Sequence, residues 1–418
     1  MSDEPEVDTS VEPQSERPPH ALTVPAFRNL WLNNLAFFMA ANAQRFVFGW
    51  FVLDGMNGTE SDQGIVVFAL GVPGLFLVLQ AGVWADRWNR KRLLIGTQLA
   101  SAAAMALAMA VVATDNESLP ILVALSLLAG AAGAIGQPVR QALVPALVSK
   151  AQLYSAIAIN AIAITLSLIL GAAVARVFGN IWGFTGAFGF LLGLFAVGIL
   201  ALIPIVIPDH EELPAQRTLR AEMADAVRFV WDNHALRTLL GLLMLAGSTF
   251  NPLVMVTMQA HVKEALGRNS GDAALPFALM GLGIALSSIV VMRKGNMKNT
   301  GAAFMRAMIG GTTIVALIGR TDALWQVTVL ALFMGLCGGF YINMNMGLIQ
   351  AHTPAPLMGR VMGLYTLIQV GLLPLGALFY GFVAARIGTG DTMSIFALVG
   401  LAGVLWVYFT DAELRQLS

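Results

Sequence analysis

The residues best able to do chemistry are gathered in one short segment, GVWADRWNRKR at positions 82–92. In a chain with only 11% charged residues, this segment contains Asp86, Arg87, Arg90, Lys91 and Arg92. A carboxylate such as Asp86 accepts hydrogen bonds from an arginine or from a helix N-terminus. Basic residues beside an apolar helix hold its end in water. The segment therefore predicts a contact between structural elements, with topology anchoring alone as the simpler interpretation of its basic residues.

No other arrangement of reactive residues indicates catalysis. The sequence has no P-loop, no zinc-ligand spacing and no Ser/His/Asp arrangement that stands out, and its five histidines are scattered. The single cysteine, Cys337, lies in an apolar run and is expected to be a small buried hydrophobe. We therefore expect no enzyme activity, no metal and no cofactor.

The composition predicts an integral membrane protein. Hydrophobic residues make up 57% of the 418, whereas a soluble domain of this size needs about a quarter of its residues charged. The formal net charge is zero, so no nucleic-acid partner is expected, and the lipid bilayer is the expected surrounding.

Twelve apolar runs are long enough to cross a bilayer as helices of about 20 residues. We therefore predict an all-α membrane protein with twelve transmembrane helices. The runs cover 27–53, 62–84, 93–114, 119–137, 153–178, 182–207, 236–262, 274–292, 301–319, 323–349, 359–385 and 391–409.

The polar stretches divide the chain. Residues 1–25 are acidic and proline-rich, a composition that predicts disorder. Six spans at 26–207 form a first bundle, and six at 236–410 form a second. The linker at 208–235 contains an amphipathic segment expected to lie along the membrane surface. Residues 411–418 form a short tail.

The distribution of positive charge predicts the orientation. If both termini and every even-to-odd loop share one side, eighteen of the 24 Lys and Arg residues lie on that side. Positive charge marks the cytoplasm, so both termini are expected inside. The predicted location is the cytoplasmic (inner) membrane, with the protein a monomer.

The two halves are predicted to be copies of each other. A shift of 209 residues aligns Arg28 with Arg237 and Asn42 with Asn251, among other polar matches in the same order. Two pseudo-symmetric six-helix bundles related by duplication are a transporter architecture, in which substrate is handled between the halves.

The charged segment at 82–92 also matches a longer sequence pattern. Gly82, Asp86, Arg87, Arg90 and Lys91 lie between the second and third spans in the pattern Gly-x-x-x-Asp-Arg-x-Gly-Arg-Arg/Lys, which resembles the signature of the major facilitator superfamily. Asn89 replaces the second Gly, and we interpret it as tolerating the left-handed conformation that a Gly would supply.

Longer segments resemble one branch of this superfamily. QPVRQALVPALV and MGRVMGLYTLIQVGLLPLGALFYG are similar to siderophore exporters of the enterobactin type and to macrolide efflux proteins. One departure is GAAVAR where GPALAG is usual, which puts Arg176 in place of a Gly. The resemblance implies alternating access. It also implies that Asp86 latches the second span to the start of the eleventh, with Arg140 and Arg360 as gate partners.

Arg45 is the most telling ionisable residue, since it lies about four residues beyond the middle of the first predicted span, and a charge there usually faces a cavity or a partner. It is either a cavity cation for an anionic or carbonyl-rich substrate, or it extends to the outer interface. Other candidates for the substrate cavity are Asn42, Asn251, Asn343 and Asn345, of which the last two could instead bond between helices.

The predicted function is export of a small organic compound by alternating access, in exchange for protons. Asp54 and His261 are the candidates for proton coupling, with a solvated loop-edge acid as the simpler interpretation of Asp54. The alternatives are an uptake carrier of the same fold and a non-transporting membrane receptor built on that fold.

Overall fold

The computed structural model describes residues 21–149, 152–206, 219–294, 299–354 and 357–417. These ranges are helical, and no strand occurs in them. Within them, eleven helical stretches are long and apolar enough to cross a membrane. The predicted all-helical membrane fold is confirmed.

Five long helices form the first half of the chain. They follow a 3-10 turn, η1 (Ala21–Thr23), in which Ala21 is fully buried, so the end of the segment predicted to be disordered contains an ordered turn. The helices are α1 (Pro25–Trp50), prolonged by the π-helical segment η2 (Phe51–Gly55), α2 (Glu60–Arg87), α3 (Arg90–Ala113), α4 (Leu119–Ala146) and α5 (Leu153–Leu202).

The helix α5 contains two crossings. Its backbone leaves the helical conformation at Trp182 and Gly183, where Gly183 has a φ of 64°. The rings of Phe178 and Phe190 stack at 4.9 Å, although twelve residues of straight helix would separate them by about 18 Å. The chain therefore reverses at Trp182–Gly183, and the fifth and sixth predicted spans form a hairpin. With this hairpin, the eleven stretches supply twelve crossings.

The second half begins with α6 (Leu219–Asp232), which corresponds to the amphipathic helix predicted in the linker. The seventh crossing is an almost continuous run of three elements, α7 (His234–Leu245), the π-helical η4 (Ala246–Phe250) and α8 (Asn251–Glu264). The remaining elements are η5 (Ser270–Ala273), α9 (Ala274–Lys294), α10 (Thr300–Ile318), α11 (Leu324–Ala351), α12 (Met358–Ile387), α13 (Thr389–Thr410) and α14 (Ala412–Gln416).

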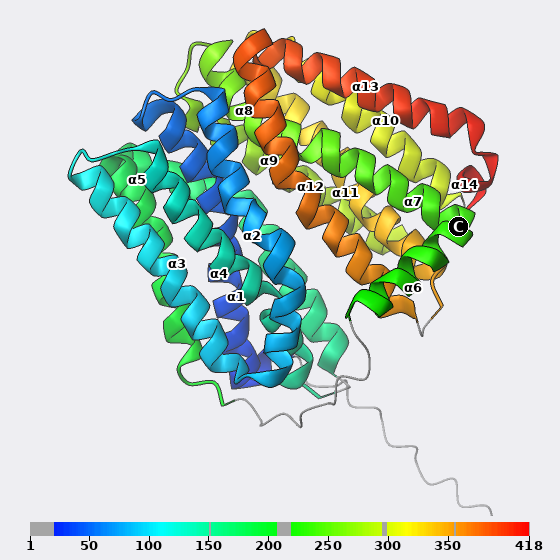
Figure 1. Ribbon diagram of the computed structural model, residues 1–418, viewed down its shortest axis with the longest axis horizontal. Coiled ribbons are helices and arrows are strands. Elements are labelled where there is room, and N and C mark those ends of the chain that lie inside the picture. Colours follow the sequence, from blue (N-terminus) through cyan, green and yellow to red (C-terminus); the bar gives the residue numbers. More distant parts are fainter. Residues whose placement is uncertain (1–20, 150–151, 207–218, 295–298, 355–356, 418) are drawn as a thin grey trace, which may run out of the picture.

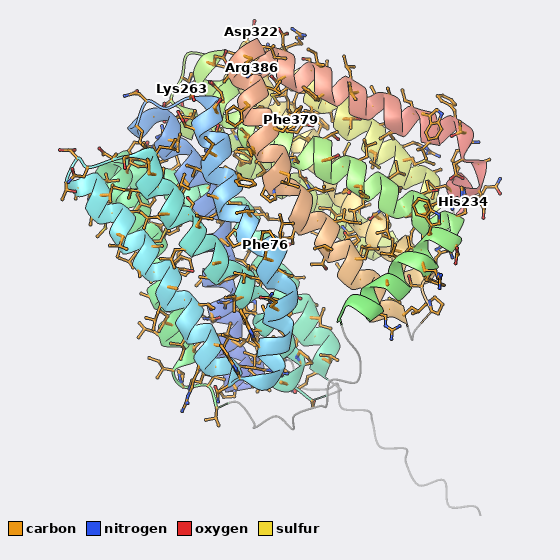
Figure 2. All side chains as sticks on the ribbon, viewed as in Figure 1. Phe76, His234, Lys263, Asp322, Phe379 and Arg386 are labelled. Carbon is orange, nitrogen blue, oxygen red and sulfur yellow. The ribbon has the colours of Figure 1, made fainter. Side chains whose placement is uncertain are left out.

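The helices form two groups, α1 to α5 and α7 to α13, which meet near one end of the molecule and spread apart toward the other (Figure 1). We call the first end, which carries residues 51–64, 259–274 and 377–391, the contact end. The opposite end, where α1 begins and α13 ends, is the terminal end. In Figure 2, Lys263, Asp322 and Arg386 lie at the contact end and His234 lies far from it.

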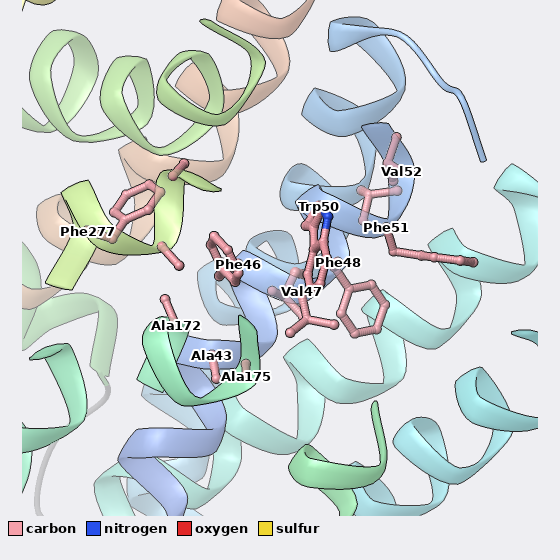
Figure 3. Close-up of a cluster of buried hydrophobic side chains, with 14 of the residues drawn as sticks. Ala43, Phe46, Val47, Phe48, Trp50, Phe51, Val52, Ala172, Ala175 and Phe277 are labelled. Atoms are coloured by element: carbon pink, nitrogen blue, oxygen red, sulfur yellow. The ribbon is translucent and has the colours of Figure 1, made fainter. Parts of the chain in front are cut away.

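A cluster of buried apolar side chains joins the two groups at the contact end (Figure 3). The ring of Phe46 on α1 meets that of Phe277 on α9 edge-on, with centroids 6.2 Å apart. Within the first group, Trp50 lies 4.7 Å from Phe184 beyond the α5 turn. The apolar core therefore positions η2 and η5 opposite each other.

Candidate functional site

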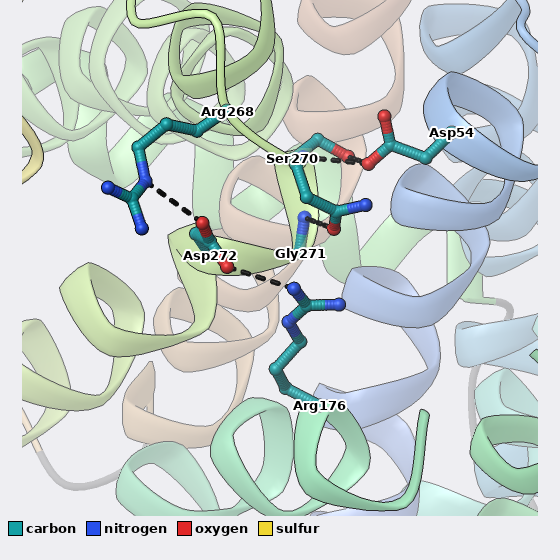
Figure 4. A network of polar contacts seen from close by, with 7 residues as sticks. Asp54, Arg176, Arg268, Ser270, Gly271 and Asp272 are labelled. Carbon is teal, nitrogen blue, oxygen red and sulfur yellow. Dashed lines mark hydrogen bonds and ion pairs between the residues drawn. The ribbon is translucent and has the colours of Figure 1, made fainter. Parts of the chain in front are cut away.

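The two groups of helices are linked by polar contacts at the contact end. The Oδ2 atom of Asp54 in η2 accepts hydrogen bonds from both the backbone N–H and the hydroxyl of Ser270 in η5, each at 2.7 Å (Figure 4). Lys263 of α8 donates to the backbone carbonyl of Leu53, and its Nζ lies 3.7 Å from Asp54 Oδ1. Asp54, one of the predicted proton-coupling residues, thus lies at the centre of a contact between the halves.

A second link is the ion pair between Arg176 of α5 and Asp272 of η5, with Nη2 and Oδ1 2.9 Å apart (Figure 4). Asp272 also pairs with Arg268 at 3.0 Å, and the guanidinium of Arg176 lies 4.5 Å from the ring centroid of Trp50. The residue that departs from the branch pattern therefore has a specific partner across the interface. Neither Asp272 nor Ser270 was a predicted site residue, because nothing in the spacing places their loop opposite η2.

A buried layer of amides lies below these ion pairs. The Nε2 atom of Gln63 on α2 donates to Oε1 of Gln259 on α8 at 2.9 Å, and Gln259 Nε2 donates to the carbonyl of Phe46 at 3.0 Å. A Cβ atom at Gly49 would lie 2.4 Å from Gln259 Oε1. Glycine is required there for α1 to approach this amide pair. We call Gln63 and Gln259 the amide pair.

These contacts are individually weak. The side chains of Arg176 and Asp272 are partly exposed, and such pairs contribute at most about 1 kcal/mol each. No single polar contact of this kind holds the interface closed, and the apolar cluster beside them supplies the rest of the contact. The geometry is suited to reversible closure.

Arg45, the predicted cavity cation, lies on α1 one helical turn from Gly49. Its side chain is exposed despite its position within the span. It has no hydrogen-bond or ion-pair partner among the described residues. Because residues i and i+4 share a helix face, Arg45 lies on the face that approaches the amide pair.

The asparagines predicted for the cavity are placed differently from one another. Asn42 donates to Ser167 of α5 at 3.0 Å, Asn343 donates to Ser288 of α9 at 2.9 Å, and buried Asn345 donates to the carbonyl of Leu239 at 3.3 Å. These three amides bond within their own group of helices. Asn251 begins α8 and is half-buried.

His261, the second candidate for proton coupling, is buried in the second group. Its two ring nitrogens lie 3.3 Å from Thr389 Oγ1 and 3.2 Å from Thr321 Oγ1. Nearby, Glu264 accepts a hydrogen bond from the backbone N–H of Thr389 at 3.1 Å. The histidine thus connects the loop before α11 to the first turn of α13.

Only part of the charged segment can be described. The side chains of Gly82, Asp86 and Arg87 lie outside the described residues, although their backbone ends α2. Lys91 donates to the carbonyls of Ile203 and Ile205 at 2.6 and 2.7 Å. It thus provides hydrogen-bond donors for carbonyl groups at the C-terminal end of α5.

The interpretation of Asn89 was wrong. The residue has a φ of −61°, not a left-handed conformation, and its side chain accepts a hydrogen bond from the backbone N–H of Arg92 at 3.1 Å. Asparagine is favoured here because it caps the N-terminus of α3.

The predicted gate partners lie at the terminal end. Arg140 on α4 is 1% exposed, donates to Asn33 Oδ1 and stacks over the ring of Phe37, with its Cζ 3.7 Å from the centroid. Its Nε and Nη2 have no hydrogen-bond partner in the described part of the chain. Arg360 lies in the first turn of α12.

Twelve crossings in two groups, joined by breakable contacts at one end, define a polytopic membrane carrier. The chain belongs to the Major Facilitator Superfamily, since the model of that family matches residues 30–373. It is a membrane transporter acting on small molecules and not an enzyme. No group of three or more potential metal-binding side chains occurs in the described ranges.

Curated relatives are similar over most of the chain. The multidrug efflux pump Tap of Mycobacterium tuberculosis is 28% identical over 374 residues, covering 84% of this chain and 85% of the relative. The enterobactin exporter EntS of Citrobacter koseri is 25% identical, covering 86% of each chain. The predicted resemblance to the efflux branch is confirmed.

Solved structures support the same fold. The nucleoside transporter NupG, as a D323A mutant, superposes with a TM-score of 0.75 over 92% of this chain and 100% of its own, at 14% identity. A POT family transporter superposes with a TM-score of 0.69 over 94% and 96%, at 11% identity.

Proposed function

We propose that this protein exports a small organic compound across the cytoplasmic membrane by alternating access, in exchange for protons. The observation that carries the proposal is the closure between the two groups of helices at the contact end. Asp54 with Ser270 and Arg176 with Asp272 form it from a few exchangeable contacts. The names of Tap and EntS, an efflux pump and an exporter, support the direction of transport.

The proposed movement is a rocking of the first bundle, 26–207, against the second, 236–410. In one state the contact end is closed, as here. In the other, the ion pairs and the amide pair separate and the terminal end closes. The predicted latch between Asp86 and the start of α12, with Arg140 and Arg360 beside it, would stabilise that second state.

The orientation follows from the positive charges. Loops at the terminal end carry most of the Lys and Arg residues, which favours a cytoplasmic position for that end and for both termini. The contact end then faces outward. The conformation is therefore interpreted as closed to the outside, with the release of substrate requiring the contact end to open.

The proton-coupling candidates remain Asp54 and His261. In the closed state, the Asp54 carboxylate accepts two hydrogen bonds from Ser270, one of them from its backbone N–H. Protonation of Asp54 would remove negative charge opposite Lys263 and weaken this closure. An external proton on Asp54 would therefore favour the open contact end, whereas His261 would act within its own group.

The test is transport in everted membrane vesicles from cells that express the protein, with a panel of radiolabelled toxic organic compounds. Proton-driven export is supported if a compound accumulates in the everted vesicles and an uncoupler abolishes the accumulation. Vesicles from cells with the empty vector should show no accumulation. Accumulation in right-side-out vesicles instead indicates uptake. Absence of flux for every compound favours the receptor alternative and contradicts the proposal.

A further inference from the structure

Arg45 is a cation inside a membrane span, with no hydrogen-bond or ion-pair partner among the described residues. It lies 20 residues from the start of α1 and ten from the end of η2, so it is about 30 Å and 15 Å from those ends at helical rise. A charged side chain at such depth is costly unless a partner or water compensates it. The charge of Arg45 therefore requires a compensating group or water inside the span.

Among the described residues, no carboxylate pairs with Arg45. The nearest acid on the same span is Asp54, nine residues further, or about 13 Å along the axis. That acid is already bound to Ser270 and faces Lys263. No ion pair to Arg45 occurs in the ranges that the structure describes. The described part of the chain therefore leaves Arg45 available to an anion that the protein does not itself provide.

The side chain faces the space between the two groups of helices. Leu35, Phe38, Asn42, Arg45 and Gly49 are spaced by three or four residues, so they share one face of α1. At Gly49 this face reaches Gln259 on the other group. These five residues, which we call the α1 stripe, therefore lie on the side of α1 that approaches the second half. The amide pair lies next to the stripe, toward the contact end.

Extension of Arg45 to the outer interface is disfavoured by the same geometry. Cα–Cβ bonds in a helix tilt toward its N-terminus, which for α1 is the terminal end. On the other side, the amide pair and the carbonyl of Phe46 occupy the path toward the contact end. Both features disfavour a path of the guanidinium to the nearer interface.

We propose that Arg45 binds the negatively charged group of an organic anion, and that the transported compounds are amphiphilic anions. A guanidinium offers a planar pair of donors that matches a carboxylate, sulfonate or phosphate. Half-buried Leu35 and Phe38, on the same stripe, provide an apolar surface for the rest of the molecule. The part of the inference that concerns transported compounds rests on the proposed export function. The anion site itself can be tested separately by binding.

The test uses purified full-length protein and matched pairs of ligands. A panel of aryl carboxylates and sulfonates of one to four rings is titrated calorimetrically, each beside its neutral carboxamide or sulfonamide. The variants are Arg45→Gln, Arg45→Lys and, as the matched control, Arg386→Gln, which removes an exposed arginine at the contact end. Size-exclusion profiles and melting temperatures establish that each variant is folded.

The expected result is that several acids bind the wild type at least about tenfold more tightly than their neutral partners, the range of a charge-assisted hydrogen bond. Arg45→Gln abolishes this preference, Arg45→Lys keeps part of it, and Arg386→Gln keeps all of it. Equal binding of acids and neutral partners, absence of binding by every acid, or an unchanged preference in Arg45→Gln would overturn the proposal.

Transport separates this inference from the proposed function. An acid that binds through Arg45 but shows no flux in vesicles contradicts export and leaves the anion site intact. Flux of neutral or cationic compounds that is the same in wild type and Arg45→Gln supports export and contradicts the anion site.

Discussion

Gly64 of α2 and Gly381 of α12 bring the two halves of the protein into backbone contact. A Cβ atom at Gly64 would lie 3.0 Å from the Cα of Gly381, and one at Gly381 would lie 2.9 Å from the Cα of Gly64. Two turns further along, Gly71 meets the ring of Pro374. The close approach of α2 and α12 at the contact end therefore depends on residues without a side chain.

Replacing Gly64 by Leu should open the contact end. The added side chain would meet backbone that cannot move aside locally, and such overpacking typically costs about 1–3 kcal/mol. Since only the closed state contains this contact, the cost shifts the equilibrium toward the open one. Labelling of a cysteine in Ser270→Cys by an impermeant maleimide, in a Cys337→Ser background, should become about tenfold faster.

Gly193→Leu is the matched control for this change. Gly193 lies on the second arm of α5 and has no atom within 4 Å of its Cβ position. Its substitution should leave the labelling rate unchanged. Equal rates in Gly64→Leu and the parent would show that the halves do not separate at this contact.

The pair formed by Arg176 and Asp272 should stabilise the closed state slightly. Asp272→Asn removes the acceptor charge from both Arg176 and Arg268, and the effect should be about 1 kcal/mol or less because the pair is partly exposed. The labelling rate should rise a few-fold, and the difference should shrink at high salt. Arg268→Gln serves as the control, since Arg268 is the more exposed of the two arginines and belongs to the same loop as Asp272. An effect of Arg268→Gln equal to that of Asp272→Asn would contradict a link between the halves.

The helices were predictable because their signal is local. Twelve apolar runs of membrane-spanning length correspond to twelve crossings, and even the α5 hairpin is anticipated by the break between 178 and 182. The charged segment, likewise, identified the superfamily through residues at fixed spacing. Composition and spacing were sufficient for the fold and for the family.

The contacts across the interface were not predictable in the same way. Arg176 was noticed as an unusual residue, but Asp272 is 96 positions away and no periodicity links the two. Asp54 was interpreted from its place at the edge of a span, yet its partners Ser270 and Lys263 come from the other half. Packing of one bundle on the other determines these pairs, and this packing is not encoded in any one segment.

Lys91 should contribute to stability through the end of α5. Its ammonium caps the carbonyls of Ile203 and Ile205, and loss of such hydrogen bonds costs about 1 kcal/mol. Lys91→Met should therefore lower the melting temperature of the purified protein by a few degrees. The control is Arg92→Gln, because Arg92 is exposed and the described residues offer its side chain no partner. A melting temperature that falls equally in both variants would indicate a general charge effect instead of a cap.

A covalent link between η2 and η5 should trap the closed contact end and stop transport. The Asp54 carboxylate lies 2.7 Å from both the hydroxyl and the backbone nitrogen of Ser270, so paired cysteines at these positions come within reach of a disulfide. Because Asp54 is itself a candidate for proton coupling, the readout is counterflow of substrate in vesicles, which needs no proton gradient. In a Cys337→Ser background, Asp54→Cys with Ser270→Cys should lose counterflow on mild oxidation and regain it on reduction. Ser270→Cys alone should be insensitive to oxidation, which separates the link from damage elsewhere. Because alternating access requires η2 and η5 to separate in every cycle, full transport by the oxidised, cross-linked protein would refute the rocking movement itself and not only the role of Asp54.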